Sequence, residues 1–198
     1  MTTESQQPPP QQSTPDYPVR LSIDYVDEPR NRLTVFFRII TIIPITLVSS
    51  SITLLIWPVL LMMFFRQKYP RWFFDFNFEL LEFSTRIGAH ATLLTDNYPS
   101  TDSEQGIHLI LDYPDTTQLN RWLPLIKWIL VIPHYVVLSV LIVIAGVMVI
   151  LGWLAILFTG RLPRGIHNFV EGVAKWGVRV IAYSFLLTTD KYPPFSLD

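Results

Sequence analysis

The chain has 198 residues, of which 50% are hydrophobic and only 16% are charged, and its formal net charge is -1. A nearly neutral chain has no general electrostatic attraction for nucleic acid, and the lack of cysteine excludes disulfides, thiolate catalysis and thiolate metal sites. Soluble domains carry about 25% charged residues, so this composition favours a membrane protein.

The chain divides into a polar tail and two copies of one unit. Residues 1–16 are rich in Gln, Pro, Ser and Thr and lack both a basic start and an apolar segment. We therefore expect a short disordered tail and no signal peptide. Residues 17–99 and 106–195 repeat one another in order, with a linker at 100–105. An internal repeat of this kind sets the architecture before any local motif is considered.

Each copy opens with a short segment of alternating apolar and polar residues. The apolar positions are Leu21, Ile23 and Tyr25 in the first copy and Leu109, Leu111 and Tyr113 in the second. Alternation with a period of two predicts a strand. Because a lone short strand is unstable in water, we expect the two strands to pair with each other.

A long apolar run follows each strand. Residues 39–65 carry no charge, and residues 128–160 contain no acidic or basic side chain other than His134. Both runs exceed the roughly 18 apolar residues that mark a membrane span, and a straight helix through the full run would overshoot a hydrocarbon core of about 30 Å. Each run is therefore either a helical hairpin or an interfacial helix that leads, at Pro44 or Pro133, into a single span.

Basic residues flank both ends of each run. They are Arg20, Arg30, Arg32 and Arg38 before the first run, Arg66, Lys68 and Arg71 after it, Arg121 and Lys127 before the second, and Arg161 and Arg164 after it. A hairpin places all of them on one side, in agreement with the positive-inside rule. We therefore expect a transmembrane hairpin in each copy. The expected tips are Ser49-Ser50-Ser51 in the first and Ser139 or Ala145-Gly146 in the second.

An amphipathic helix is expected after each hairpin. Its polar stripe consists of Asp75, Glu79, Glu82 and Arg86 in the first copy and of Glu171, Lys175 and Arg179 in the second. A wide apolar face beside a charged strip is typical of a helix that lies in the membrane interface. The alternative is a further span, with the two stripes buried against each other, where intramembrane charge would mark a functional site.

Residue types with catalytic potential occur without a catalytic setting. The four histidines have no metal-ligand spacing, and no nucleophile lies near a base, so we expect no catalytic, cofactor or metal site. His134, after Pro133, is expected to hydrogen-bond a carbonyl that the proline frees. Asp24 and Asp112 occupy equivalent positions and would allow a pair of carboxylates, although turn bonding at the strand ends is the simpler explanation.

Two basic clusters are candidates for contact with anionic lipid or partner proteins. They are Arg66, Lys68 and Arg71 in the first copy and Arg161 and Arg164 in the second. Each charge near an anionic membrane surface contributes about 1 kcal/mol to binding. The simpler interpretation is that these residues only set the topology, and the two interpretations are compatible.

Three motifs of the second copy carry a family resemblance. They are Asn-Arg-Trp-Leu-Pro-Leu-Ile-Lys-Trp-Ile-Leu-Val-Ile-Pro-His at 120–134, Leu-Phe-Thr-Gly-Arg-Leu-Pro-Arg-Gly at 157–165, and Leu-Leu-Thr-Thr-Asp-Lys-Tyr-Pro-Pro-Phe at 186–195. Together they resemble the bacterial membrane family called domain of unknown function 4389, in two tandem copies. The first copy departs from these motifs, with Tyr-Pro-Arg-Trp-Phe in place of Arg-Leu-Pro-Arg-Gly. The resemblance implies an integral bacterial membrane protein and transfers no activity.

The sequence as a whole predicts a mainly α-helical membrane protein in which each copy contains a strand, a transmembrane hairpin and an interfacial helix. We expect a multi-pass protein of the bacterial inner membrane whose amino terminus and paired strands are cytoplasmic. The expected function is that of a non-enzymatic accessory or scaffold protein whose cytoplasmic face binds partner proteins or anionic lipids. The alternative is a small transporter or lipid-handling protein with its site between the repeats.

Overall fold

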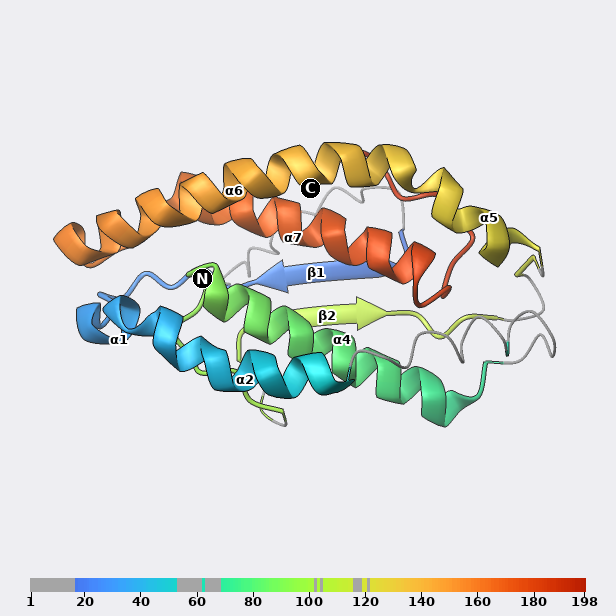
Figure 1. The fold of residues 1–198 in the computed structure, drawn as a ribbon, viewed down its shortest axis with the longest axis horizontal. Coiled ribbons are helices and arrows are strands. Elements are labelled where there is room, and N and C mark those ends of the chain that lie inside the picture. Colours follow the sequence, from blue (N-terminus) through green and yellow to red (C-terminus); the bar gives the residue numbers. More distant parts are fainter. Residues whose placement is uncertain are drawn as a thin grey trace, which may run out of the picture.

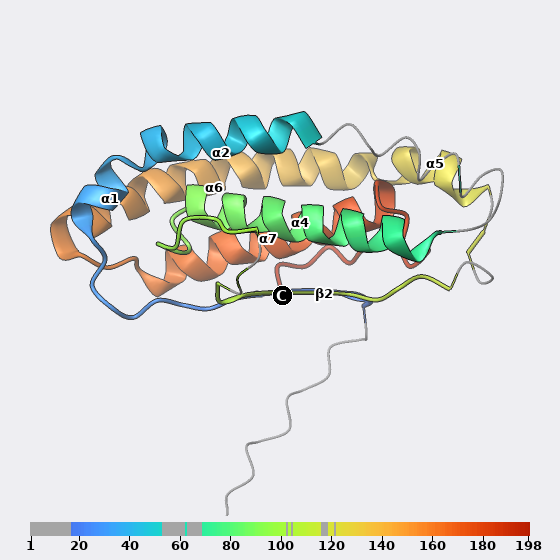
Figure 2. The same ribbon diagram turned by 90° about the horizontal axis from the view of Figure 1, so that it is seen from below.

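The computed structural model describes residues 17–52, 62, 69–101, 103, 105–115, 119–120 and 122–198. Within these ranges the elements are β1 (Val19–Ile23), α1 (Arg32–Phe36), α2 (Arg38–Ile52), α4 (Arg71–Ala91), β2 (Ile107–Leu111), α5 (Leu123–Leu130), α6 (Ile132–Thr159) and α7 (Arg164–Ser184). They form three layers: the sheet, then α4 and α7, then α2, α5 and α6 (Figure 2). The expected tail at 1–16 lies outside the described residues.

The two strands pair with each other, as predicted. They run antiparallel, with Leu21 opposite Leu109. The face of the sheet that carries Leu21 and Leu109 is covered by the helices. The alternate side chains, including Arg20, point to the other face and are exposed. Antiparallel pairing also separates the two aspartates, because Asp24 follows the last residue of β1 and Asp112 the last residue of β2. They lie at opposite ends of the sheet, so the possible carboxylate pair does not form.

Each strand packs on the amphipathic helix of the other copy. β1 lies against α7, and β2 lies against α4 (Figure 1). The tyrosine hydroxyl after each strand repeats this exchange: Tyr25 donates a hydrogen bond to the Leu162 carbonyl, and Tyr113 donates one to the Tyr69 carbonyl. The two copies are therefore interlocked through their strands.

An arginine at the start of each amphipathic helix also contacts the tyrosine that follows the strand of the other copy. The Arg164 guanidinium lies 5.0 Å from the centre of the Tyr25 ring, and that of Arg71 lies 4.9 Å from the centre of the Tyr113 ring. Arg164 also forms an ion pair with Asp27 of the first copy, at 2.9 Å. Equivalent residues thus make equivalent contacts across the two copies, in both directions.

The apolar run of the second copy forms one long helix. α6 continues for 28 residues, about 42 Å, through both expected hairpin tips, Ser139 and Ala145-Gly146, so the predicted hairpin is wrong. The physical reason is that the run has no helix breaker after Pro133, and a proline in the first turn of a helix is tolerated. The structure instead agrees with the alternative in which a short helix, α5, leads at this proline into a single long one.

The serine run of the first copy is helical as well. α2 extends from Arg38 to Ile52, with Pro44 inside it, so Ser49-Ser50-Ser51 does not form a hairpin tip. The Ser50 hydroxyl donates to the Leu47 carbonyl of its own turn, which is compatible with a helix. The second leg of the expected hairpin falls on residues 53–61 and 63–68, which lie outside the described residues.

The amphipathic helices form the middle layer of the protein. α7 contacts β1, α5 and α6, and α4 contacts β2 and α2. Their apolar faces are covered mainly by protein, with Trp72 and Phe76 of α4 as exposed exceptions, so they are not the outward-facing surfaces that the sequence led us to expect. Both helices begin after a proline, Pro70 or Pro163. Each is followed by a leucine with positive φ, Leu93 at 66° or Leu187 at 57°.

Two glycines, one inside α6 and one at its end, allow a test that α6 is a single continuous helix. Gly160 ends the helix with φ at 76°, a conformation that favours glycine, whereas Gly146 lies inside the helix with open space around it. We expect Gly160→Ala to lower the free energy of unfolding by about 1 kcal/mol and Gly146→Ala to raise it by 0.5 to 1 kcal/mol, roughly. Denaturant unfolding in one detergent measures both. A loss of stability in Gly146→Ala would contradict a continuous helix.

Candidate functional site

A buried ion pair closes the second copy. Lys127 of α5 is completely buried, and its Nζ lies 2.8 Å from an Asp190 carboxylate oxygen and donates to the Thr189 carbonyl at 2.6 Å. The same ammonium lies 4.8 Å from the centre of the Tyr183 ring. Burial lowers the pKa of Lys127, and Asp190 opposes that shift. The pair therefore ties the helix before α6 to the loop after α7.

The first copy contains an equivalent ion pair. Arg38 of α2 donates from Nη2 to an Asp96 carboxylate oxygen at 2.6 Å and from Nη1 to the Thr95 carbonyl at 3.0 Å. Both cations stand six residues before the proline of their apolar run, and both aspartates follow a threonine in the closing motif of their copy. The sequence interpretation took Arg38 and Lys127 for topology-setting charges. Their shared spacing from the proline is the signal that would have identified them as a structural pair.

A left-handed leucine precedes each of these aspartates by three residues. Leu93 and Leu187 have positive φ, which is uncommon for a bulky side chain and costs roughly 1 to 2 kcal/mol. Both side chains are buried, so packing compensates for the strained backbone. The resulting turn places the carbonyls and the carboxylate of the loop around the buried cation.

The first copy has an additional buried cation. Arg30, whose side chain is fully buried, donates to the carbonyls of Leu93 and Leu94 and lies 3.6 Å from Asp96. The equivalent position in the second copy, eight residues before Lys127, is Leu119. Asp96 therefore serves two buried guanidiniums, whereas Asp190 serves one ammonium.

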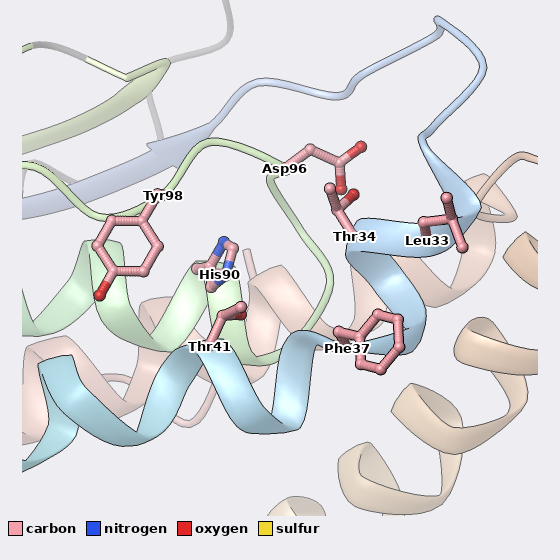
Figure 3. A pocket seen from close by; sticks show the side chains of 7 residues that line it. All are labelled: Leu33, Thr34, Phe37, Thr41, His90, Asp96 and Tyr98. Carbon is pink, nitrogen blue, oxygen red and sulfur yellow. The ribbon is translucent and has the colours of Figure 1, made fainter.

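A pocket of about 310 Å³ lies beside this cluster (Figure 3). It is lined by Leu33, Thr34, Phe37, Thr41, His90, Asp96 and Tyr98. His90 is 5% exposed, and neither of its ring nitrogens has a hydrogen-bond partner. Burial, with a smaller effect from the positive charge of Arg38, lowers the pKa of His90, although the nearby Asn97 backbone and Asp96 favour its charged form. The imidazole is therefore neutral near pH 7.

The central parts of the two polar stripes make structural contacts. In α4, Arg86 forms an ion pair with Glu82 at 2.6 Å and donates to the Ser100 carbonyl at 3.0 Å. In α7, Arg179 donates to the Ser196 carbonyl at 3.2 Å, so equivalent arginines hold equivalent loops. These side chains bind backbone of their own copy and do not face the other stripe.

Glu171 joins α7 to the sheet. Its carboxylate accepts the Ile23 backbone N–H at 3.0 Å and forms an ion pair with Lys175 at 3.1 Å. At the start of α4, by contrast, Asp75 and Glu79 are exposed, and Asp75 pairs with Arg71 at 3.2 Å. Among the described residues, no ion pair links α4 to α7. The stripes therefore do not form a shared charged surface between the repeats.

The predicted basic clusters are not brought together. Arg71 stands at the start of α4, whereas Arg161 and Arg164 stand at the start of α7, at the opposite end of the molecule (Figure 1). All three are exposed. Arg66 and Lys68 lie outside the described residues. Each end of the molecule thus carries its own exposed positive charge.

His134 has a different partner from the one expected. Its Nδ1 accepts a hydrogen bond from the Trp176 indole at 2.9 Å, and its ring stacks on Phe195 at 3.9 Å. The expected bond to a carbonyl is wrong, because the Nε2 that would donate it has no hydrogen-bond partner. No group of three or more His, Asp or Glu side chains that could hold a metal occurs in the part of the chain that the structure describes.

The family described as "Domain of unknown function (DUF4389)" matches residues 32–101 and 122–196. The chain belongs to this family. The two matches confirm the resemblance and its two tandem copies. No curated protein and no solved structure matches the chain. Each DUF4389 segment contains one of the two equivalent ion pairs, Arg38 with Asp96 or Lys127 with Asp190, whereas β1 and β2 lie outside both segments.

The two buried ion pairs predict a large effect of neutralising either aspartate. Asp190→Asn or Asp96→Asn leaves a buried cation without its counter-charge, so we expect a loss of about 3 kcal/mol in the free energy of unfolding. The control Asp75→Asn removes an exposed pair and should cost less than about 1 kcal/mol. Equal losses in all three variants, measured by denaturant unfolding, would show that the buried pairs do not hold the loops.

The buried histidines of α4 and α7 predict a dependence of stability on pH. Burial lowers the pKa of both His90 and His167 below the ordinary value, about 6.5. The unfolded chain therefore takes up these protons first as the pH falls, so stability is full above about pH 6.5 and decreases as the pH falls through the lowered pKa values. Unfolding measured from pH 7.5 to 5 should show this decrease, and a double His90→Gln, His167→Gln variant should show less of it. An unchanged slope would refute the assignment.

Proposed function

We propose that this DUF4389 protein is a non-enzymatic accessory protein of the bacterial cytoplasmic membrane. In this proposal its outer helices lie in lipid and its sheet faces cytoplasmic partner proteins. Figure 2 shows that the outer helices and the sheet lie on opposite sides of a three-layer molecule. The observation that carries the proposal is that the outer helices expose mainly apolar side chains and the sheet mainly polar ones.

The outer layer exposes many large apolar side chains. They include Leu33, Phe37, Ile39, Ile40 and Leu47 on α1 and α2, Ile129 on α5, and Val136, Val140, Val143, Ile150 and Phe158 on α6. Apolar patches of more than a few hundred Å² mark protein or membrane contacts. In the described part of the chain, α6 is the one helix long and apolar enough to cross a membrane. Lipid suits this surface, because exposed hydroxyls among these side chains, such as those of Thr41, Thr46 and Ser139, donate hydrogen bonds to carbonyls of their own helix.

The opposite surface is polar. The outer face of the sheet exposes Arg20, Ser22 and His108, with Ile110 as its one exposed aliphatic side chain. Asp24 follows β1 on the same surface, 3.4 Å from the His108 ring. The polar side chains of the middle layer, such as Arg86 and Glu171, are occupied by structural hydrogen bonds. This arrangement supports a function in binding at the sheet face better than chemistry inside the fold.

The packing of α6 supports an orientation in the membrane plane. α6 runs beside α7, and the sheet extends along the same long axis (Figures 1 and 2). If α6 crossed the bilayer, the two-stranded sheet would stand in hydrocarbon with both edges unpaired. The charge of Arg20 alone would then cost about 2.5 to 3.5 kcal/mol. We therefore propose that the described helices lie in one leaflet.

The in-plane orientation also explains why basic residues flank both ends of the apolar runs. Arg71 lies at one end of the long axis and Arg164 at the other (Figure 1). With this axis parallel to the membrane, both ends meet head groups on the same, cytoplasmic side, which agrees with the positive-inside rule without any crossing. Exposed arginines at both ends then contact anionic head groups.

Depth measurements on α6 test the orientation. The chain contains no cysteine, so single cysteines introduced at Ile132, Val143 and Phe158 report the start, middle and end of the exposed side of α6. We expect a fluorophore at each site, in vesicles, to be quenched best by the same shallow position of spin-labelled lipid. A crossing helix would instead place Val143 near the bilayer centre and the two ends near opposite surfaces.

The polar sheet face supplies the matched control. A cysteine at Ser22, which is exposed on β1, should react with a membrane-impermeant maleimide added to inverted vesicles and not with the same reagent added to intact cells. Labelling from the cell exterior would reverse the proposed orientation. Recovery of the unmodified chain in the aqueous fraction after cell lysis would overturn the membrane location itself.

A further inference from the structure

The pocket between α1, α2 and α4 combines an apolar rim with an unsatisfied polar interior (Figure 3). Leu33 and Phe37 line it and are 69% and 48% exposed, as part of the apolar outer surface. His90 lines it from α4 and is buried, with both ring nitrogens unpartnered. A neutral imidazole always carries one N–H, and no acceptor meets hydrogen-bond geometry at either ring nitrogen of His90, although the Asn97 backbone lies near enough to favour its charged form.

Positive charge is in excess behind the pocket. Asp96 lines the pocket, and the two arginines that pair with its carboxylate lie behind it, Arg38 at 2.6 Å and Arg30 at 3.6 Å. The buried Nε groups of both arginines have no hydrogen-bond partner. His90 is neutral, so the local sum is two positive charges and one negative charge. An uncompensated buried charge is costly, and a nearby anion relieves that cost.

Comparison of the two copies shows that this excess belongs to the first. In the second copy, the position of Arg30 is occupied by Leu119, and α7 has Tyr183 where α4 has His90. There Lys127 meets one aspartate and one aromatic ring, so its charge is balanced. In the first copy, Arg30 therefore adds a positive charge, and His90 adds ring nitrogens without a hydrogen-bond partner. Both lie beside the pocket.

We propose that this pocket binds the phosphate-bearing head group of an anionic lipid. A phosphate oxygen accepts the hydrogen bond that the His90 N–H offers, and its negative charge offsets the excess of Arg30 and Arg38. The acyl chains leave the pocket over Leu33 and Phe37, which already belong to the apolar surface. The site goes beyond the proposed function, since it specifies one bound lipid, and it does not depend on the orientation of α6.

Binding of short-chain lipids to the full-length protein in a neutral detergent tests the proposal. Calorimetry compares dihexanoyl phosphatidylglycerol, which has the phosphate, with dihexanoylglycerol, which has the same chains and no phosphate. We expect one site for the phospholipid, with an affinity at least about tenfold higher than for the diacylglycerol, as a charge-assisted hydrogen bond provides. Equal affinities would overturn the assignment of an anion site.

Variants then locate the site. His90→Leu removes the donor and should weaken phospholipid binding about tenfold. Thr41→Trp, at an exposed pocket position, should block binding by bulk without disturbing the core. The matched control is His167→Leu, which removes the buried histidine of α7, a residue that does not line this pocket. Unchanged binding in Thr41→Trp, or equal loss in the His167 control, would refute the location.

A last titration separates a lipid from a water-soluble ligand. Glycerol 3-phosphate offers the phosphate without acyl chains. Binding at least tenfold weaker than that of the phospholipid supports a lipid site, because the apolar rim then contributes. Equal binding would overturn the lipid assignment in favour of a soluble phosphate ester. These results are independent of the vesicle measurements, so failure here leaves the proposed membrane function intact, and the reverse also holds.

Discussion

The antiparallel pairing of β1 with β2 is the constraint on which the rest of the structure depends. It turns one face of the sheet toward α4 and α7 and brings each strand onto the helix of the opposite copy. The hydroxyls of Tyr25 and Tyr113 fix this exchange at the two ends of the sheet. The sheet covers one side of α4 and α7, and the outer helices cover the other side. The sides of the outer helices that face away from α4 and α7 expose apolar side chains.

The two copies contain similar buried ion pairs, but the residues around these pairs differ. The pair of Lys127 and Asp190 is balanced, so its function is to close the loop after α7. In the first copy Arg30 joins the equivalent pair, and His90 adds an unpartnered ring next to a pocket. The same scaffold therefore carries a structural site on one side and a site with spare binding capacity on the other.

Sequence patterns predicted local periodicity well and burial poorly. Alternation at Leu21 and Leu109 was enough to predict paired strands, and the motifs of the second copy were enough to identify the family. The hairpin of the second copy and the serine tip of the first were wrong because the positive-inside rule was applied to helices assumed to cross a membrane, whereas α6 has no breaker near Ser139 and Ser49-Ser50-Ser51 is helical. Lys127 was misplaced for a related reason: a charge beside an apolar run was taken to face water. Its partner, Asp190, is distant in sequence, and the left-handed Leu187 that positions it has no sequence signature.

The exchange of strands has a consequence for how such a chain can arise and change. A single copy has a strand whose partner, and whose helix, belong to a second copy, so it is complete only as a symmetric dimer. Joining the two copies in one chain keeps this arrangement and removes the requirement that both halves be identical. Position 30 can then be arginine while position 119 is leucine, a difference that no homodimer can have. The joining of the two copies in one chain thus allows one copy to acquire a binding site while the other keeps the residues that stabilise the fold.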